Sequence, residues 1–508
     1  MRNQTHPTER ARIYARVKNA LFGDNAPYPT RTKRSRWPFL LLLIGGLFAA
    51  IQISTLAQAP AAPASLPKQP FFDWAKTPPM GWNSWDCYGC TVNEEQTKAN
   101  ADYMAEKLAK YGWQYIVVDI QWYTDSTRGF DYARVPQITL DEWGRLLPVP
   151  SKFPSATDGK GFKPLADAIH GKGLKFGVHL LRGIPRVAVD KNTPIQGTDF
   201  HAADIADRKS TCPWNPDMYG VDMTKPGAQE YYNSVFKLFA EWGVDYVKVD
   251  DLSRPYHKPE VEALRKAIDA SGRPMVLSTS PGNTPLPEGE HVATHANLWR
   301  VSDDFWDNWK LLYNQFGLLD RWTPYRAAGH WPDADMLPIG NVRAIEPNGW
   351  TRFTRDEQVT MLTLWCIARS PLMIGGHMPK NDAFTESLIT NDEVLAVNQN
   401  SANNRQLFRK DGTVAWIAEA PESADRYLAV FYTGNAPAKN QPPVGGAPAQ
   451  TPSQEEKEQT VPVQLTDLGF PGTCKIRDLW KKEDLGQFKN EFAPKLPLHG
   501  AGLYRVSP

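Results

Sequence analysis

Two segments of the sequence pair a cation with a carboxylate at a spacing that suits an extended strand. In the run 244–251, alternate side chains of a strand point to opposite faces, so Lys248 and Asp250 share one face. Val247 and Val249 fall on the other face, which predicts that they pack against helices. A lysine beside a carboxylate keeps it ionised, as a nucleophile requires. Asp250 is therefore a candidate nucleophile.

The second segment, residues 299–304, places Arg300, Ser302 and Asp304 on one face by the same alternation. Two carboxylates from different strand ends suit cleavage of a glycosidic bond, because one attacks the anomeric carbon while the other protonates the leaving oxygen. The other interpretation is structural, since carboxylates at strand ends also cap helices or pair with arginines. The pattern by itself leaves both interpretations open.

The order of elements along the chain could bring these groups together. Residues 79–399 alternate short β-branched runs with longer amphipathic segments such as 93–111 and 228–242, which is typical of repeated βα units. We therefore expect a (β/α)8 barrel over residues 72–400, with its reactive groups at the C-terminal ends of the strands. The expected strands are 80–83, 115–119, 174–179, 244–250, 274–278, 298–301, 323–327 and 371–374.

The chain changes character after residue 400. Residues 401–508 hold short strands separated by turn residues, which predicts a C-terminal antiparallel β-sandwich domain. Within it, residues 434–459 are rich in Pro, Ala, Gln and Glu, and we expect a flexible loop there. The predicted fold class is α/β, a TIM barrel followed by a β-sandwich.

The first 64 residues are expected to form an N-terminal extension with an export signal or anchor. Basic residues within 31–36 lead into an apolar run, residues 37–53, and small residues follow it. The run is slightly short for a membrane span, and cleavage and retention as an anchor both stay open. The protein is expected to be secreted or periplasmic, with membrane anchoring through residues 37–53 as the alternative.

Composition limits the partners that the chain can have. Its 57 Lys and Arg balance its 56 Asp and Glu, which gives no electrostatic basis for binding nucleic acid. Its 18 Trp could stack on sugar rings or fill cores, so a neutral oligosaccharide or polysaccharide is the expected partner. No histidine pair has ligand spacing near a carboxylate, and we expect neither a metal nor a cofactor. Five cysteines in an exported chain predict a disulfide, with Cys87 and Cys90 as a local candidate.

Six motifs follow one another along the chain at plausible spacing. They are 77–85 (TPPMGWNSW), 115–119 (YIVVD), 242–250 (WGVDYVKVD), 299–304 (WRxxxD), 331–337 (WxDxDML) and 499–504 (HGAGLY). Together they resemble glycoside hydrolase family 27, the melibiase or α-galactosidase family, from about residue 72 to the C-terminus. The resemblance implies a retaining enzyme with a (β/α)8 barrel, a following β-sandwich and no cofactor.

The resemblance also implies roles for individual residues. Asp250 matches the nucleophile and Asp304 matches the acid/base. The other matches bind or flank the sugar: Trp85 as an aromatic platform, Lys248 and Arg300 at sugar hydroxyls, Asp119 at the hydroxyls on the far side of the ring, and Asp335 near the pocket.

Three stretches of the chain depart from the family pattern. Ile120 follows Asp119 where the family has a second acidic residue, so one carboxylate that would bind the 4- or 6-hydroxyl is missing. His179 and Arg182 stand at the end of the third strand, where they could rebuild the pocket, although a histidine at a strand end can also be structural. Ser280 lies in a run of small residues that leaves room near the 2-position of the sugar.

These features predict a retaining exo-glycosidase that hydrolyses terminal α-D-galactosides through a covalent glycosyl-enzyme intermediate. The departures leave other sugars open: an α-N-acetylgalactosaminide, a β-L-arabinopyranoside or an α-glucan. A non-catalytic carbohydrate-binding protein is the alternative of another class. Ile120 and the altered third strand favour it, and the retention of both presumed catalytic carboxylates opposes it.

Overall fold

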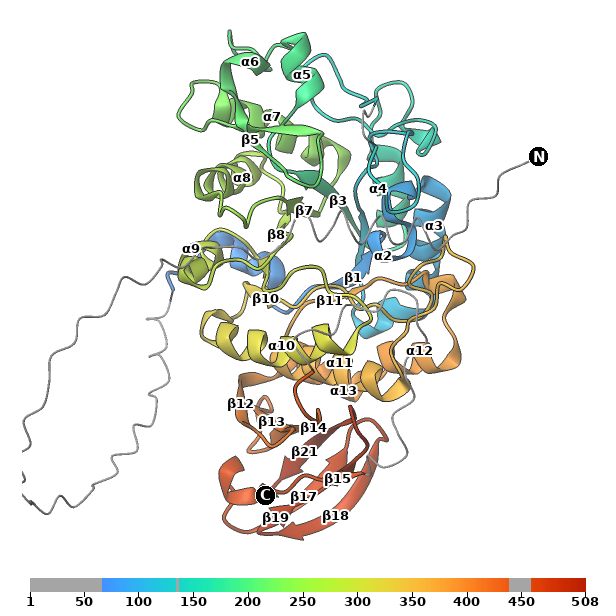
Figure 1. Ribbon diagram of the computed structural model, residues 1–508, viewed down its shortest axis with the longest axis vertical. Coiled ribbons are helices and arrows are strands. Elements are labelled where there is room, and N and C mark those ends of the chain that lie inside the picture. The colour runs from blue at the N-terminus through green and yellow to red at the C-terminus, as the bar shows by residue number, and fades with distance from the viewer. Residues whose placement is uncertain (1–65, 134–136, 438–457) are drawn as a thin grey trace, which may run out of the picture. The chain divides into compact units, whose positions relative to one another are not determined.

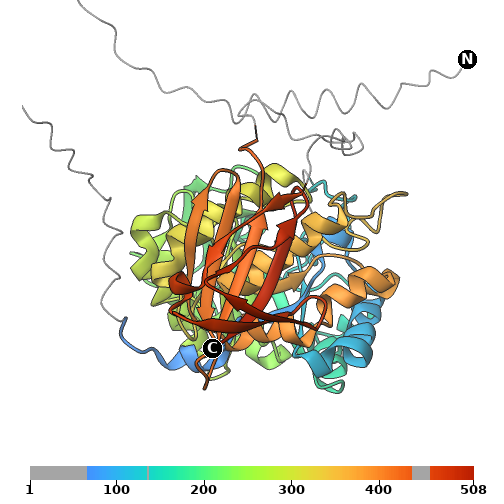
Figure 2. The ribbon, with the colours of Figure 1, turned by 90° about the horizontal axis from the view of Figure 1, so that it is seen from below.

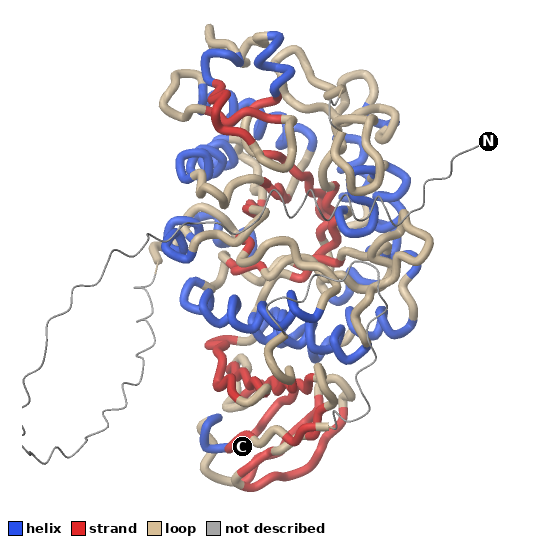
Figure 3. Tube along the Cα trace, viewed as in Figure 1, coloured by secondary structure: helices blue, strands red, loops and turns tan. Residues whose placement is uncertain are grey.

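The centre of the fold is a parallel sheet, seen in a computed structural model that describes residues 66–133, 137–437 and 458–508. The strands are β1 (Met80–Asn83), β2 (Tyr115–Val118), β3 (Lys175–Leu181), β7 (Tyr246–Asp250), β8 (Val276–Thr279), β9 (Leu298–Arg300), β10 (Trp331–Asp333) and β11 (Leu372–Ile374). The strands lie side by side in the order β10-β9-β8-β7-β3-β2-β1-β11, so each strand neighbours the next one of the sheet along the chain, and the last strand lies beside the first. Every neighbouring pair is parallel. Helices surround these strands (Figures 1 and 3).

An additional bridge joins the two ends of the strand order. Leu337, which follows β10, forms an isolated parallel bridge with Ile374 of β11. The backbone N–H of Leu337 donates to the carbonyl of Met373 at 2.7 Å, and the N–H of Gly375 donates to the carbonyl of Leu337 at 2.9 Å. The sheet therefore curls round on itself as a TIM-like barrel, as the sequence predicted.

Side chains of the strands alternate between two clusters. Val247 and Val249 of β7 belong to the large core between the sheet and the helices. Tyr246 belongs to a second cluster inside the barrel, together with Tyr115 and Trp331. The predicted outward direction of the two valines is confirmed, because strand geometry alone fixes this alternation.

One predicted strand is wrong. Residues Thr323–Tyr325 form a 3-10 helix, η7, and the chain enters the sheet only at Trp331. Pro324 fits the first turn of such a helix because its fixed φ suits that position and its missing N–H is not needed there. The true strand spans three residues and contains Pro332, so it carries almost no strand pattern in the sequence.

Hydrogen bonds from neighbouring side chains fix where outer helices begin. The helix that starts at Arg355 follows a capping box, in which Glu357 N–H donates to the Thr354 hydroxyl at 3.2 Å and Thr354 N–H donates to Glu357 at 3.0 Å. The helices are α2 (Trp85–Tyr88), α3 (Glu94–Tyr103), α4 (Lys163–His170), α5 (Arg186–Lys191), α6 (Ala202–Ile205), α7 (Ala228–Trp242), α8 (Lys258–Ala270), α9 (Gly289–Ala293), α10 (Trp309–Trp322), α11 (Arg355–Ala368), α12 (Ala383–Ile389) and α13 (Asp392–Asn400).

A long excursion separates β3 from α7. It contains α5, α6 and a small antiparallel sheet, and it lies at the top of Figure 1. The strands of this sheet are β4 (Ile184–Pro185), β5 (Ala206–Thr211) and β6 (Met218–Val221), in the order β4-β6-β5. Because the excursion leaves from the C-terminal end of β3, it builds part of the rim on which reactive groups of such barrels lie.

The C-terminal part is an antiparallel β domain (Figure 2). Its main sheet has six strands in the order β12-β13-β14-β21-β17-β18, with bounds β12 (Ala402–Lys410), β13 (Thr413–Glu419), β14 (Arg426–Tyr432), β17 (Thr473–Asp478), β18 (Glu483–Lys489) and β21 (Ala501–Ser507). Two short pairs accompany it: β15 (Gln459–Thr460) with β20 (Lys495–Leu496), and β16 (Val463–Gln464) with β19 (Glu491–Phe492).

Both faces of the six-stranded sheet are covered. Trp416 and Phe431 point into the large core shared with the barrel helices. Their neighbours Ile417 and Val430 point into a separate core, which the chain between β14 and β21 completes. The strands β13 and β14 therefore carry apolar side chains on both faces, as strands buried between two layers require.

Two sequence predictions lie outside the described residues. These are the export segment 37–53 with the rest of the extension 1–64, and residues 438–457 of the expected loop. Among the residues that are described, no helix is long and apolar enough to cross a membrane.

The predicted disulfide is wrong. All five cysteines are free thiols, and each is buried. The Cys87 thiol is directed to the carbonyl of Ser84 at 3.6 Å, at the start of α2, and not to the neighbouring cysteine. Spacing alone had suggested a pair, but burial and hydrogen bonding are enough to explain cysteines of this kind.

Candidate active site

The carboxylate of Asp250 ends β7 and is buried beside Lys248 and His179. Lys248 Nζ lies 3.9 Å from its Oδ1, and His179 Nε2 lies 3.0 Å from its Oδ2. Burial would raise the pKa of Asp250, but the charges of Lys248 and His179 outweigh burial and lower this pKa to about 2. Asp250 is therefore an ionised carboxylate over the whole range of ordinary pH.

Asp119, directly after β2, holds the same lysine. Lys248 Nζ donates to Asp119 Oδ2 at 2.9 Å, and Asn83 Nδ2 donates to the same oxygen at 2.8 Å. The backbone N–H of Ile120 donates to Asp119 Oδ1 at 2.8 Å. Burial would lower the pKa of Lys248, but Asp119 and Asp250 raise it above its ordinary value. Lys248 is thus a permanent cation between two carboxylates.

A metal ion could in principle use part of this arrangement. Among the described residues, Asp119, His179 and Asp250 each place one potential ligand atom within 4.8 Å of the others. The Lys248 ammonium already lies between the two carboxylates and pairs with both. The cluster is therefore explained by an ion-pair network whose cation is a side chain.

The second half of the site is built on Arg300, the last residue of β9. Its Nη2 lies 2.7 Å from Asp335 Oδ2 and 3.4 Å from Asp304 Oδ1, and its Nη1 is 3.5 Å from the Ser280 hydroxyl. The side chain of Asp304 is 55% exposed, whereas that of Asp250 is 7% exposed. One carboxylate is thus enclosed and ionised, and the other is open to solvent and ligand.

Asp335 is held in an unusual backbone conformation. Its φ is +83°, in the left-handed region that few residues other than glycine adopt. Its N–H donates to Asp333 Oδ1 at 2.8 Å, and its carbonyl accepts from Trp365 Nε1 at 3.0 Å. Its Oδ2 accepts from the N–H of Phe305 at 2.7 Å. Asp335 therefore fixes the segment that carries Asp304 as well as contacting Arg300.

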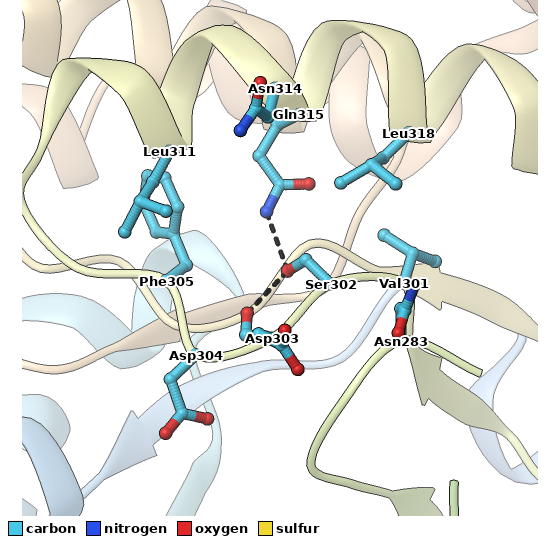
Figure 4. Close-up of a pocket in the computed structure, with 10 residues that line it drawn as sticks. All are labelled: Asn283, Val301, Ser302, Asp303, Asp304, Phe305, Leu311, Asn314, Gln315 and Leu318. Atoms are coloured by element: carbon cyan, nitrogen blue, oxygen red, sulfur yellow. Dashed lines mark hydrogen bonds between the residues drawn. The ribbon is translucent and has the colours of Figure 1, made fainter. Parts of the chain in front are cut away.

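Ser302 does not join Arg300 and Asp304 as the sequence predicted. The strand ends at Arg300, so its alternation does not continue to residue 302. The Ser302 hydroxyl accepts from Gln315 Nε2 of α10 at 2.8 Å and donates to the Asp303 carbonyl at 2.8 Å, beside a pocket of about 200 Å³ (Figure 4). Asp304 points away from α10 in the same view. The hydrogen bond between Ser302 and Gln315 thus holds the segment after β9 against α10.

Trp85 lies at the start of α2. Its backbone N–H donates to Asn83 Oδ1 at 2.9 Å, so Asn83 fixes both Trp85 and Asp119. The Trp85 ring is half-buried and stacks against Tyr132, with centroids 5.8 Å apart and planes at 15°. Part of this ring is thus accessible next to polar groups, which suits a ligand with apolar and hydroxylated sides.

Predicted residues from four strand ends line one small cavity. Lys248, Ser280, Arg300 and Asp335 line it, and Asn83 lies beside them. The sequence prediction missed Asn83, although it is polar and ends β1, which is the same signal that identified Asp250. The structure therefore joins the lysine-centred and arginine-centred halves into one site.

Arg182 does not rebuild the pocket. Its guanidinium lies 2.7 Å from Asp251 Oδ2 and 2.7 Å from Glu260 Oε1, and it is buried with both. Asp251 turns away from Asp250 with φ +68°. These charges form a buried network outside the cavity, so Arg182 has a role in the fold.

Comparison with known families gives two matches that together span most of the described chain. The profile of alpha galactosidase A matches residues 77–223 and 219–400. The profile of the alpha galactosidase C-terminal beta sandwich domain matches residues 416–506.

Individual relatives carry different activities in their names. An alpha-galactosidase of Cyamopsis tetragonoloba is 27% identical over 85% of this chain and 87% of its own length. A β-L-arabinopyranosidase of glycoside hydrolase family 27 from Geobacillus stearothermophilus is 50% identical, with a TM-score of 0.80 over 86% of this chain and 98% of that one. A variant of that enzyme has been solved in complex with arabinose. A proposed alpha-N-acetylgalactosaminidase of Bacillus halodurans C-125 is 46% identical, with a TM-score of 0.73 over 85% of this chain and 97% of that one.

Proposed function

The chain belongs to glycoside hydrolase family 27, the melibiase or α-galactosidase family, and on this basis we propose that it removes terminal β-L-arabinopyranosyl residues with retention of configuration. Terminal α-D-galactosides are the second candidate substrates, because the curated relatives at about 27% identity are named for them. The reaction class is that of a glycoside hydrolase, and the sugar and the residue roles are the proposal.

The proposed reaction has two steps. Asp250 attacks the anomeric carbon while Asp304 donates a proton to the leaving oxygen, which gives a covalent glycosyl-enzyme and a free alcohol. Asp304, now a carboxylate, takes a proton from water as that water attacks the anomeric carbon and releases Asp250. Lys248 lowers the pKa of Asp250 in spite of its burial and so suits it to the first role, and exposure suits Asp304 to the second.

The residue that carries the choice of sugar is Ile120. A β-L-arabinopyranoside has the ring of an α-D-galactoside without its hydroxymethyl group. Ile120 is 1% exposed and directly follows Asp119, at the position where the family has a second carboxylate. An isoleucine cannot accept a hydrogen bond from the extra hydroxyl, and an unmet buried hydroxyl costs about 1–3 kcal/mol. Together with the 50% identical β-L-arabinopyranosidase, this favours the sugar without that group.

The experiment is the release of nitrophenol from β-L-arabinopyranoside, α-D-galactoside, α-N-acetylgalactosaminide and α-D-glucoside by the purified chain. We expect the arabinopyranoside to have the highest kcat/KM, about tenfold or more above the galactoside. Ile120→Asp should reverse or narrow this preference. A higher kcat/KM for the galactoside in the unmodified chain would assign the second candidate instead.

The residue roles are tested with matched carboxylate variants. Asp250→Asn should reduce turnover to background, and Asp304→Asn should reduce it by about 10²–10⁴-fold for a sugar leaving group. Asp303→Asn is the control, since Asp303 is the neighbour of Asp304 and forms an exposed pair with Arg254. Full turnover by Asp250→Asn would refute the mechanism, and turnover of no glycoside would favour a carbohydrate-binding protein.

A further inference from the structure

Five aromatic side chains form an unbroken row of ring contacts at the proposed site. Centroid distances along the row are 5.8 Å for Trp306 and Phe130, 5.8 Å for Phe130 and Trp85, 5.8 Å for Trp85 and Tyr132, and 5.4 Å for Tyr132 and Trp214. All five side chains are half-buried, so part of each remains accessible. Rings that only filled a core would be enclosed.

The row is assembled from four loops on one rim of the barrel. Trp85 follows β1, and Phe130 and Tyr132 lie in the segment after β2. Trp214 lies in the excursion after β3, and Trp306 lies in the segment after β9. These loops all leave the C-terminal ends of strands, where binding residues of such barrels gather. The row therefore belongs to the binding face of the barrel.

One end of the row lies on the side of Asp304. Trp306 is two residues after Asp304, so their Cα atoms are at most about 7 Å apart. An acid that protonates the leaving oxygen must contact it, so the leaving group must pass Asp304. The Arg343 guanidinium lies 5.3 Å from the centroid of the Trp306 ring and forms an ion pair with Asp307. This pair fixes the ring in place beside the segment that carries Asp304.

We propose that Trp306 and Phe130 form the binding surface for the first sugar of the leaving group. The substrate is then an oligosaccharide or polysaccharide that carries the terminal sugar. This inference rests on the proposed function, because it uses Asp304 as the acid. Trp214, at the other end of the row, contacts Tyr132 and is separated from this surface by Trp85.

The test compares two substrates that end in the same sugar. The glycosyl fluoride has a one-atom leaving group that cannot reach the surface, whereas an oligosaccharide can. The ratio of kcat/KM, oligosaccharide over fluoride, should fall about tenfold in Trp306→Ala and Phe130→Ala, because stacking on the ring is lost. Trp306→Phe should retain most of the ratio, since it keeps a flat ring. Tyr313→Ala is the matched control, because this half-buried ring on α10 contacts Arg409 of β12 and belongs to no part of the proposed site, and it should keep the ratio of the unmodified chain.

An unchanged ratio in Trp306→Ala would overturn the inference. Equal losses on both substrates would also overturn it, since they would assign Trp306 to support of the Asp304 loop. Loss of the ratio in Trp306→Phe as in Trp306→Ala, with the thermal midpoint retained, would argue against a stacking contact. If the unmodified chain turned over neither substrate, the proposed function would fail first and the inference with it.

Discussion

At the residue scale, the two candidate catalytic carboxylates differ in environment and therefore in chemistry. The side chain of Asp250 is 7% exposed, and Lys248 and His179 approach it from two sides. The side chain of Asp304 is 55% exposed and contacts Arg300 only at 3.4 Å. A nucleophile must stay ionised, whereas an acid/base must gain and lose a proton in each cycle. The surroundings therefore suit Asp250 to the first of the two proposed tasks and Asp304 to the second.

Lys248→Met is expected to move the acidic limb of the kcat/KM profile to higher pH. Lys248 helps to lower the pKa of Asp250 to about 2, and without it burial pushes that pKa toward and beyond its ordinary value of about 4. Protonated Asp250 cannot attack, so the variant loses activity at a pH where the unmodified chain still works. Rates from about pH 3 to pH 7 measure the limb. Lys163→Met is the control, because Lys163 forms an exposed ion pair with Asp167. An acidic limb that does not move in Lys248→Met would contradict the assignment.

Thiol titration is expected to find five reactive cysteines in the unfolded, unreduced chain. In the native chain far fewer should react, since all five are buried and burial raises the pKa of each thiol above its ordinary value. Ellman's reagent with and without guanidinium makes the measurement. A titre two thiols lower after unfolding would indicate a disulfide and contradict the structure.

At the element scale, buried ion pairs connect the βα units that carry the site. Arg182, one residue beyond β3, contacts Asp251 after β7 and Glu260 on α8. Its backbone N–H also donates to the carbonyl of Asp250 at 3.0 Å. Tyr232 of α7 donates to Glu260 at 2.5 Å, which adds a second helix to the network. The position of Asp250 thus depends on charges that never contact the cavity.

Arg182→Ala is expected to lower the free energy of unfolding by about 3–5 kcal/mol, because it leaves two carboxylates buried without a cation. Arg208→Ala is the matched control: its partner is Asp190, both side chains are more than half exposed, and the expected loss is under about 1 kcal/mol. Urea unfolding of the three proteins gives both values. Similar small losses in the two variants would show that the network does not support the fold.

At the scale of the whole molecule, the barrel and the β domain share a core. Trp416 and Phe431 of the six-stranded sheet belong to the same apolar cluster as the barrel helices. His499 stacks on Trp309 of α10 with centroids 3.5 Å apart, and its Nδ1 lies 2.8 Å from Glu357 of α11. Such a joint is buried and largely apolar, unlike the polar contact of two independent domains.

Thermal unfolding is therefore expected to show a single cooperative transition. The barrel helix α11 is buried along almost its whole length, so separation of the β domain would expose its apolar side chains to water. Calorimetry, together with fluorescence of the tryptophans, follows both parts at once. Two resolved transitions would contradict the shared core. Trp416→Ala should lower the midpoint of the whole transition, with a loss of about 3–5 kcal/mol at a buried site.

Several parts of the fold and site could be read from local patterns. Alternation along β7 predicted that Lys248 and Asp250 share a face, because the geometry of a strand depends on neighbouring residues alone. The same rule failed at Ser302, where the strand had already ended. It also failed at residues 323–327, where a proline-containing turn resembled a strand and the true strand, Trp331–Asp333, was too short to show a period.

The sequence by itself determined which carboxylates and cations end the strands, how the chain divides into βα units and β strands, and which family the motifs match. Only the tertiary structure decided that Lys248 joins Asp119 to Asp250, that Arg300 contacts Asp335 more closely than Asp304, and that aromatic side chains from four loops form one row. The physical reason is that these contacts join residues far apart in the chain. They depend on how the sheet closes into a barrel and on how the loops, whose sequences show no period, cross its rim.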